Sequence, residues 1–208
     1  MTSTLDLAIL VADADMEATI STLLKHRQPA LGIQLNLEHL KIFRSHMHDP
    51  GVFKEGPDLL QSLQPRPGHA LLLLDYHGSG QENKLQASEV ESDLEERLER
   101  QLTLARDKVA CIVLNPELEV WVWSQSPHLL TVLGMDRQQF TAFKQSQGIG
   151  LHDKPQRPKE ALIRALRQTK KPFSSAIYKE LAQNVSLSNI NERGFVKLRD
   201  KLQSWFRG

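Results

Sequence analysis

The chain has 208 residues, 40% of them apolar and 25% charged, which is ordinary for a globular protein and excludes disordered and coiled-coil classes. This length allows one full domain, or a domain with a helical extension, but not two large domains. No apolar run approaches the roughly 20 residues that cross a bilayer, and the acidic N-terminus is unlike a secretory signal. The single cysteine, Cys111, lies in an apolar run. We therefore expect a cytoplasmic protein with a reduced core thiol and no membrane partner.

The net charge of +1 conceals an asymmetry between the two halves of the chain. Residues 1–125 carry 11 basic and 19 acidic side chains, a net charge of −8, and residues 126–208 carry 15 basic and 6 acidic, a net charge of +9. An acidic half can concentrate metal-binding carboxylates. A basic half can attract polyanions or simply dock on the acidic half.

Strand-like and helix-like segments alternate in the first half. Short apolar runs predict strands at residues 7–11, 37–43, 70–74 and 109–114. Helical spacing of apolar residues predicts helices at 14–27 and 50–63, and a capping box of Ser88 with Glu91 predicts a third that ends near residue 104. This order predicts an α/β domain over residues 1–125, with a four-stranded, mostly parallel sheet flanked by helices.

The second half shows only helical signals. Pro127 after Ser126, and Asp136 with Gln139, indicate two helix starts. A loop rich in Gly and Pro spans residues 147–159, and further helices are predicted at 158–168, 175–183 and 192–206. Residues 126–208 are therefore predicted to form an all-helical extension packed on the α/β domain.

Acidic side chains follow three of the predicted strands. Asp13 and Glu17 follow the first, Asp75 follows the third and Glu119 follows the fourth. Ligands of parallel sheets bind outside the carboxyl ends of the strands, and converging carboxylates repel unless a cation lies among them. Each acid alone can be a helix N-cap or a first-turn acid, which we favour for Asp15. For the set together we favour a site for Mg²⁺ or Mn²⁺, which prefer oxygen ligands.

The order and placement of these motifs resemble the Toprim fold. The segment VADADME carries Asp13 and Glu17, LLLLDYHGSG carries Asp75 and His77 in the positions of a D-x-D motif, and NPELEVWVW carries Glu119 in an E-x-W motif. The tail segments HDKPQRPKEAL, YKELAQNVSL and NERGFVKLRDKLQSWF extend the likeness over nearly the whole chain. More narrowly, the chain is similar to bacterial Toprim-like proteins of uncharacterised function. Those proteins are related to the nucleases of overcoming-lysogenisation-defect systems and to other defence-associated Toprim proteins.

This resemblance implies divalent-metal-dependent hydrolysis of phosphodiester bonds in nucleic acid, in bacterial defence against phage, with Mg²⁺ or Mn²⁺ as cofactor. It also implies a defence-system protein as a possible partner. Asp13 would be a metal ligand or general acid/base supported by Glu17, and Asp75 would be the firmest metal ligand. His77 would be an auxiliary ligand or phosphate donor, and Glu119 a ligand from the last strand. The nearby Trp121 is expected to pack beneath the site.

Two positions differ from the usual Toprim pattern. Asp13 stands where Glu is usual, and His77 replaces the second acid of D-x-D, which removes a negative charge and favours manganese or zinc over magnesium. These differences keep a rival open, in which the protein is a non-catalytic nucleotide-binding or protein-interaction subunit with a degenerate Toprim site. Convergence of the acids on one point would favour the enzyme.

The segment RSHMHDPG offers His46 and His48 as a weak metal pair. We interpret it as a loop that lines the same cleft, with Arg44 able to reach a phosphate. A solvated turn capped by Asp49 at a helix start explains the segment equally well.

A basic segment in the second half also has two interpretations. Lys154, Arg157 and Lys159 can hold the phosphates of a nucleic acid beside the acidic cleft. Alternatively they pair with acids of the third predicted helix, namely Glu91, Glu95 and Glu99, and only join the two halves.

Overall fold

The computed structural model describes residues 4–123, 126–150, 152–187 and 190–208. Its centre is a four-stranded sheet with strand order β2-β1-β3-β4, in which every neighbouring pair is parallel. The strands are β1 (Leu5–Val11), β2 (Leu40–Arg44), β3 (Pro67–Asp75) and β4 (Val109–Leu114). The residues of β1, β3 and β4 are almost entirely buried, whereas those of β2, at one edge of the sheet, are partly exposed. The α/β prediction is confirmed.

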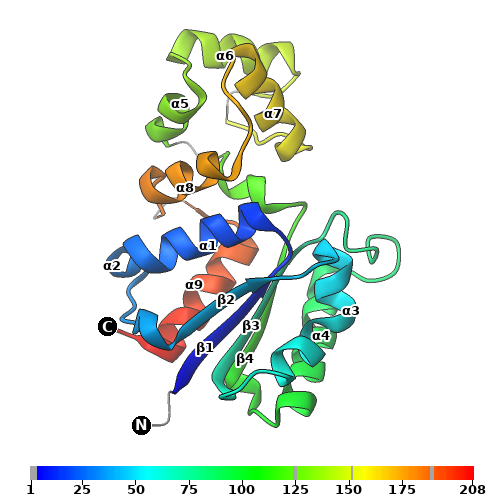
Figure 1. Ribbon diagram of the computed structural model, residues 1–208. Helices are drawn as coiled ribbons and strands as arrows, with labels where there is room; N and C mark the ends of the chain where they lie inside the picture. The colour runs from blue at the N-terminus through cyan, green and yellow to red at the C-terminus, as the bar shows by residue number, and fades with distance from the viewer. Residues whose placement is uncertain (1–3, 124–125, 151, 188–189) are drawn as a thin grey trace.

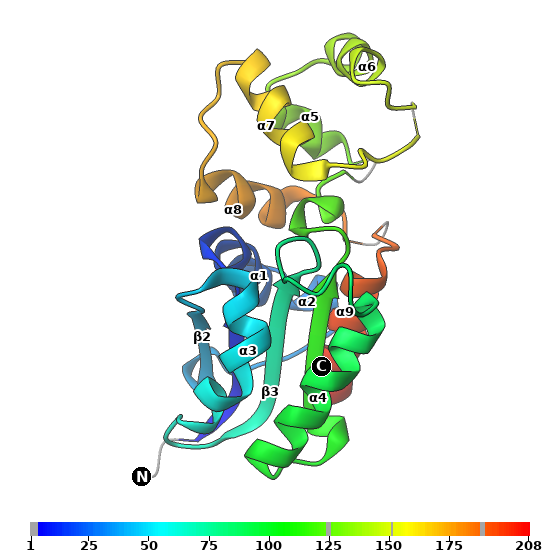
Figure 2. The ribbon, with the colours of Figure 1, turned by 90° about the vertical axis from the view of Figure 1, so that its right-hand side faces the viewer.

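Helices cover both faces of the sheet. One face carries α1 (Ala14–His26) and α9 (Arg193–Phe206), and the other carries α3 (His48–Gln61) and α4 (Ala87–Leu102) (Figures 1 and 2). The remaining helices are α2 (Gln28–Leu31), α5 (Pro127–Leu133), α6 (Arg137–Ser146), α7 (Pro158–Gln168) and α8 (Ser175–Asn184). The described residues also form short 3₁₀ helices, namely η1 (Leu37–His39), η2 (Arg106–Lys108) and η3 (Leu118–Trp121).

The second half of the chain is helical, and it meets the α/β part at several places. Figure 1 shows α5, α6 and α7 beyond the carboxyl ends of the strands, with α8 between them and α1. α8 packs against α1, α7 packs against η3, and α9 returns to cover β4. The extension therefore covers one face of the sheet and also lies over the edge where the acidic motifs end.

Two local predictions need correction. The strand predicted from residue 37 begins only at Leu40, because the Asn36 side chain accepts a hydrogen bond from the Glu38 N–H and starts η1 instead. The capping box of α4 is formed by Gln86 with Glu89, whereas Ser88 and Glu91 were predicted to form it. Glu91 is instead buried and turned towards β4.

Two glutamates of α4 cover the outer edge of β4. Glu91 accepts a hydrogen bond from the Val113 N–H (2.9 Å), and Glu95 accepts one from the Cys111 N–H (3.0 Å). Carboxylates thus satisfy backbone donors that an edge strand otherwise leaves open. This edge of the sheet is closed to pairing with another strand.

Basic residues of α9 balance these two glutamates. Lys197 lies 2.9 Å from Glu91 and 2.7 Å from Glu95, and Arg193 also pairs with Glu91. These ion pairs between α4 and α9 join the acidic and the basic half of the chain. However, the predicted pairing of the α4 acids with Lys154, Arg157 and Lys159 is wrong.

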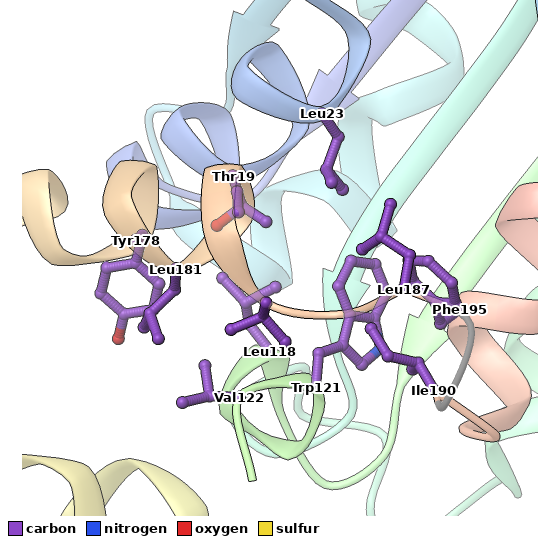
Figure 3. A pocket seen from close by; sticks show the side chains of 12 residues that line it. Thr19, Leu23, Leu118, Trp121, Val122, Tyr178, Leu181, Leu187, Ile190 and Phe195 are labelled. Atoms are coloured by element: carbon purple, nitrogen blue, oxygen red, sulfur yellow. The ribbon is translucent and has the colours of Figure 1, made fainter. Parts of the chain in front are cut away.

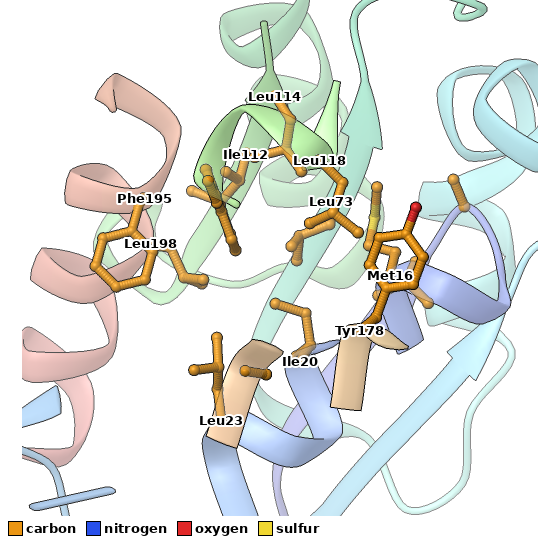
Figure 4. Close-up of a cluster of buried hydrophobic side chains, with 14 of the residues drawn as sticks. Met16, Ile20, Leu23, Leu73, Ile112, Leu114, Leu118, Tyr178, Phe195 and Leu198 are labelled. Atoms are coloured by element: carbon orange, nitrogen blue, oxygen red, sulfur yellow. The ribbon is translucent and has the colours of Figure 1, made fainter. Parts of the chain in front are cut away.

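The apolar core between α1, α8 and the sheet contains the side chain of Tyr178, whose ring ends in a polar hydroxyl group. Figure 4 shows the ring of Tyr178 among apolar side chains that include Met16, Ile20 and Leu73. Tyr178 is 1% exposed, so α8 is fixed against α1 by a fully buried aromatic residue. Its hydroxyl is held at the carboxyl edge of the sheet.

The capping box of α6 is confirmed and gives a first test of local stability. Asp136 accepts a hydrogen bond from the Gln139 N–H (2.8 Å), and the Gln139 side chain accepts one from the Asp136 N–H (3.0 Å). We expect Asp136→Ala to lower the free energy of unfolding by about 1 kcal/mol, measured by urea denaturation. Asp136→Asn keeps the acceptor and should cost much less; equal losses in the two variants would contradict this role.

Within the described residues, no helix combines the length and the apolar composition that crossing a membrane requires.

Candidate functional site

The strand order places a crevice outside the carboxyl ends of β1 and β3. The chain passes from β1 to β2 on one side and then to β3 on the other side of β1, so the direction of the crossovers reverses there. Parallel sheets bind ligands at such switch points, because the loops at the two strand ends diverge. Asp75 ends β3, and Asp13 lies two residues beyond β1. The topology therefore brings two of the predicted site residues to the expected position.

Asp13 is the N-cap of α1. Its Oδ1 accepts hydrogen bonds from the backbone N–H groups of Asp15 (3.0 Å) and Met16 (2.9 Å). Asp13 is therefore a helix cap as well as a candidate ligand. Asp15 is an acid of the first turn of α1, as expected, and its Oδ1 accepts a hydrogen bond from the Ser175 hydroxyl (2.6 Å). Capping fixes the Asp13 carboxylate at the end of β1.

Asp75 is 6% exposed, and hydrogen bonds hold both its side chain and its backbone N–H. Its Oδ1 accepts a hydrogen bond from the Leu118 N–H (2.9 Å), and its own N–H donates to Asp49 Oδ1 (2.7 Å). Burial raises the pKa of Asp75 well above its ordinary value, and the negative charges of Asp49, Glu119 and Asp13 raise it further. Asp75 is therefore repelled by each of these three carboxylates.

Glu119 is the most buried acid of this group, with 1% exposure. Its Oε1 accepts a hydrogen bond from the Tyr178 hydroxyl, and Lys159 Nζ lies 3.9 Å from the same oxygen. Burial raises the pKa of Glu119 to about 7, although the Tyr178 hydrogen bond and the Lys159 charge lower it. Its Oε2 is buried and has no hydrogen-bond partner in the described chain. A buried carboxylate oxygen without a donor is costly, and a bound cation would relieve that cost.

Lys159 brings a positive charge from the helical extension to the acidic edge, which Asp13, Asp49, Asp75 and Glu119 form at the carboxyl ends of the strands. Its backbone N–H donates to Glu117 Oε1 (2.9 Å), which anchors the start of α7 on the loop after β4. The negative charges of Glu119, Asp13 and Asp75 raise the pKa of the Lys159 ammonium and outweigh the opposing effect of burial. Of the three predicted basic residues, this one borders the acids.

Glu17 lies in a neighbouring pocket at the ends of β1 and β2. Its Oε2 is 3.0 Å from Arg44 Nε, and the same pocket is lined by Asp13, His46 and His48. The loop after β2 therefore does line the cleft beside Asp13. Glu17 therefore shares this pocket with Asp13, and its carboxylate is paired with the Arg44 guanidinium.

The other predicted site residues lie away from the acids. His77 is exposed and stacks on Tyr76, with ring centroids 6.3 Å apart. Lys154 pairs with Glu192 and donates to the Val120 carbonyl (3.2 Å). Arg157 is 79% exposed and lies 3.9 Å from Glu160.

Trp121 packs beneath the edge, as expected. It is 5% exposed and meets Phe195 edge to face, with ring centroids 5.2 Å apart. Figure 3 shows it beside Leu118, in a small apolar pocket that Tyr178 also lines. This packing fixes η3, the element that carries Glu119.

Two residues of the site were missed by sequence reasoning. Asp49 is the cap of a turn in one of the two interpretations of RSHMHDPG, but α3 begins at His48 and the Asp49 carboxylate accepts a hydrogen bond from the Asp75 N–H. The role of Tyr178 had no local signal, because its partner Glu119 is 59 residues away in the sequence.

The arrangement does not form a metal cage made of protein alone. In the described parts of the chain, no group of three or more His, Cys, Asp or Glu side chains converges closely enough to hold a metal ion. The convergence of the acids on one point, which would favour the enzyme, is thus not found among the described residues: Asp13, Asp75 and Glu119 share one region, and His77 lies outside it. Any cation bound here would need further ligands from water or substrate.

Comparison of the chain with models of known protein families, with curated proteins and with solved structures finds no match.

Proposed function

We propose that the acidic edge of the sheet binds Mg²⁺ or Mn²⁺ and hydrolyses phosphodiester bonds of nucleic acid, as the resemblance to Toprim nucleases implies. One observation carries the proposal. Glu119, 1% exposed, keeps a buried oxygen without a partner in the described chain, beside the mutually repelling carboxylates of Asp75 and Asp13. A divalent cation would satisfy that oxygen and offset the repulsion.

The donor set fits a cation that is shared with a substrate. Mg²⁺ is commonly held by one or two carboxylates together with water and substrate phosphates, whereas an all-protein cage is unusual for it. Asp75 and Glu119 can supply those carboxylates, with Asp13 at the end of the neighbouring strand. When bound, the cation would neutralise charge on the phosphate and activate the attacking oxygen.

Positive side chains around the edge would position the phosphate backbone. Lys159 lies beside Glu119, and Arg44 lines the adjoining pocket with Asp13. Arg157 is almost fully exposed on the helical extension and can contact a more distant phosphate. Such contacts hold any sequence equally, so we expect binding that weakens steeply with salt.

A second candidate function is favoured by a specific observation. Lys159 already gives Glu119 and Asp75 a positive neighbour, and His77 is turned out to solvent. A site balanced in this way can bind a nucleotide, or a protein partner from a defence system, without catalysis. The chain would then be an interaction subunit that keeps the fold.

Titration calorimetry with Mn²⁺, Mg²⁺ and nucleotides, followed by cleavage assays on single- and double-stranded DNA, RNA and transfer RNA, tests both candidates. The nuclease proposal predicts cation binding by the wild type, its loss in Glu119→Gln, and cation-dependent cleavage of at least one substrate. Glu55→Gln, an exposed acid of α3, is the matched control and should behave like the wild type. Nucleotide binding without any cleavage would favour the interaction subunit, and absence of cation binding would refute the nuclease.

A further inference from the structure

The start of α7 is fixed so that Lys159 faces the acidic edge. Pro158, the residue before it, accepts a hydrogen bond through its carbonyl from Trp123 Nε1 (3.0 Å), and the Lys159 N–H donates to Glu117 (2.9 Å). Both partners follow β4, so α7 begins against the loop that carries Glu119. The side chain of Lys159 remains 35% exposed, which leaves its ammonium group a route to solvent.

The ammonium group of Lys159 lies beside the buried carboxylates, where a positive charge is needed to balance their negative charges. Its Nζ is 3.9 Å from Glu119 Oε1, and it is attracted by the carboxylates of Asp13 and Asp75 as well. These are the same groups that the proposed function assigns to a divalent cation. Two positive centres within a few ångströms of one carboxylate repel each other, and the burial of Glu119 strengthens this repulsion.

We propose that Lys159 is a built-in counter-ion of the acidic edge, which competes with the divalent cation for Glu119 and Asp75. The inference rests on the proposed cation site. Lysine suits this role because its charge sits on a flexible four-carbon stem that can turn away into solvent or towards a substrate phosphate. The extension thereby sets how tightly the edge holds a cation when no substrate is present.

The test measures Mn²⁺ affinity by titration calorimetry at low salt. Lys159→Met removes the charge and keeps the length of the side chain, and it should bind Mn²⁺ about tenfold more tightly than the wild type. Lys159→Arg keeps the charge and should stay near the wild type. Lys179→Met, an exposed lysine of α8, is the matched control and should change nothing. Raising the salt concentration should narrow the difference between Lys159→Met and the wild type, since salt screens the competition.

The outcomes separate this inference from the proposed function. Equal Mn²⁺ affinity in the wild type and Lys159→Met would overturn the counter-ion role and leave the cation site standing. Binding only in Lys159→Met would support the counter-ion role and refute the nuclease, since the wild-type edge would then hold no cation. If no variant binds Mn²⁺, the proposed site and this inference both fail. Thermal melts in EDTA establish that each variant is folded, and Lys159→Gln, which also removes the charge, provides a second reading if Lys159→Met is unstable.

Discussion

Replacing Asp75 with asparagine should lower the rate of cation-dependent cleavage by roughly a thousandfold. A metal-binding carboxylate contributes several kcal/mol of charge stabilisation in the transition state, and each 1.4 kcal/mol corresponds to a tenfold change in rate. Asparagine retains an oxygen for the Leu118 N–H, which Asp75 Oδ1 accepts at 2.9 Å. We therefore expect the free energy of unfolding in EDTA to stay the same or rise, because one of several repelling carboxylates is gone.

Asp75→Ala is the comparison that separates an effect on cation binding from an effect on the stability of the fold. Alanine leaves the Leu118 N–H without its acceptor, so this variant should also lose about 1–3 kcal/mol of stability in EDTA. Both variants should lose Mn²⁺ binding, measured by calorimetry. If Asp75→Asn unfolds readily while its cation affinity is unchanged, Asp75 is a structural residue and the assignment of the site is wrong.

The stability of the metal-free protein should fall as the pH rises from about 5 to 8. Burial raises the pKa of Glu119 from its ordinary value of 4.5 to about 7 in the folded state. Between these values the folded protein holds a proton that the unfolded chain has released, so raising the pH favours unfolding. The stabilisation is fully lost above about pH 7, and it corresponds to about 3 kcal/mol for this group. The raised pKa values of Asp75 and Asp49 act in the same direction.

Urea denaturation in EDTA at pH 5 and pH 8 measures this effect. Glu119→Gln removes the titrating group while keeping an oxygen for the Tyr178 hydroxyl, so its stability should depend less steeply on pH than that of the wild type. Glu55→Gln should show the full wild-type dependence. Parallel pH profiles for the wild type and Glu119→Gln would mean that Glu119 is not buried in solution as it is in the structure.

The elements with strong local signals could be predicted from the sequence. The strand predicted at residues 109–114 and the helix predicted at 158–168 match Val109–Leu114 and Pro158–Gln168. An unbroken apolar run defines the first, and a proline at the first turn defines the second. The capping box of α4 was misplaced by two residues, since Gln86 with Glu89 fits the same spacing as Ser88 with Glu91. Only the packing of Glu91 on β4 decides between them.

The sequence by itself determined that the protein has a parallel sheet and that Asp13, Asp75 and Glu119 lie at one edge of it. Both follow from the alternation of strands and helices, because every parallel strand ends at the same edge. Only the tertiary structure decided which neighbours each acid has. Tyr178 and Lys159 reach Glu119 from α8 and α7, and His77 turns away into solvent. These contacts depend on how the extension packs on α1 and η3, and packing between distant segments leaves no periodic pattern along the chain.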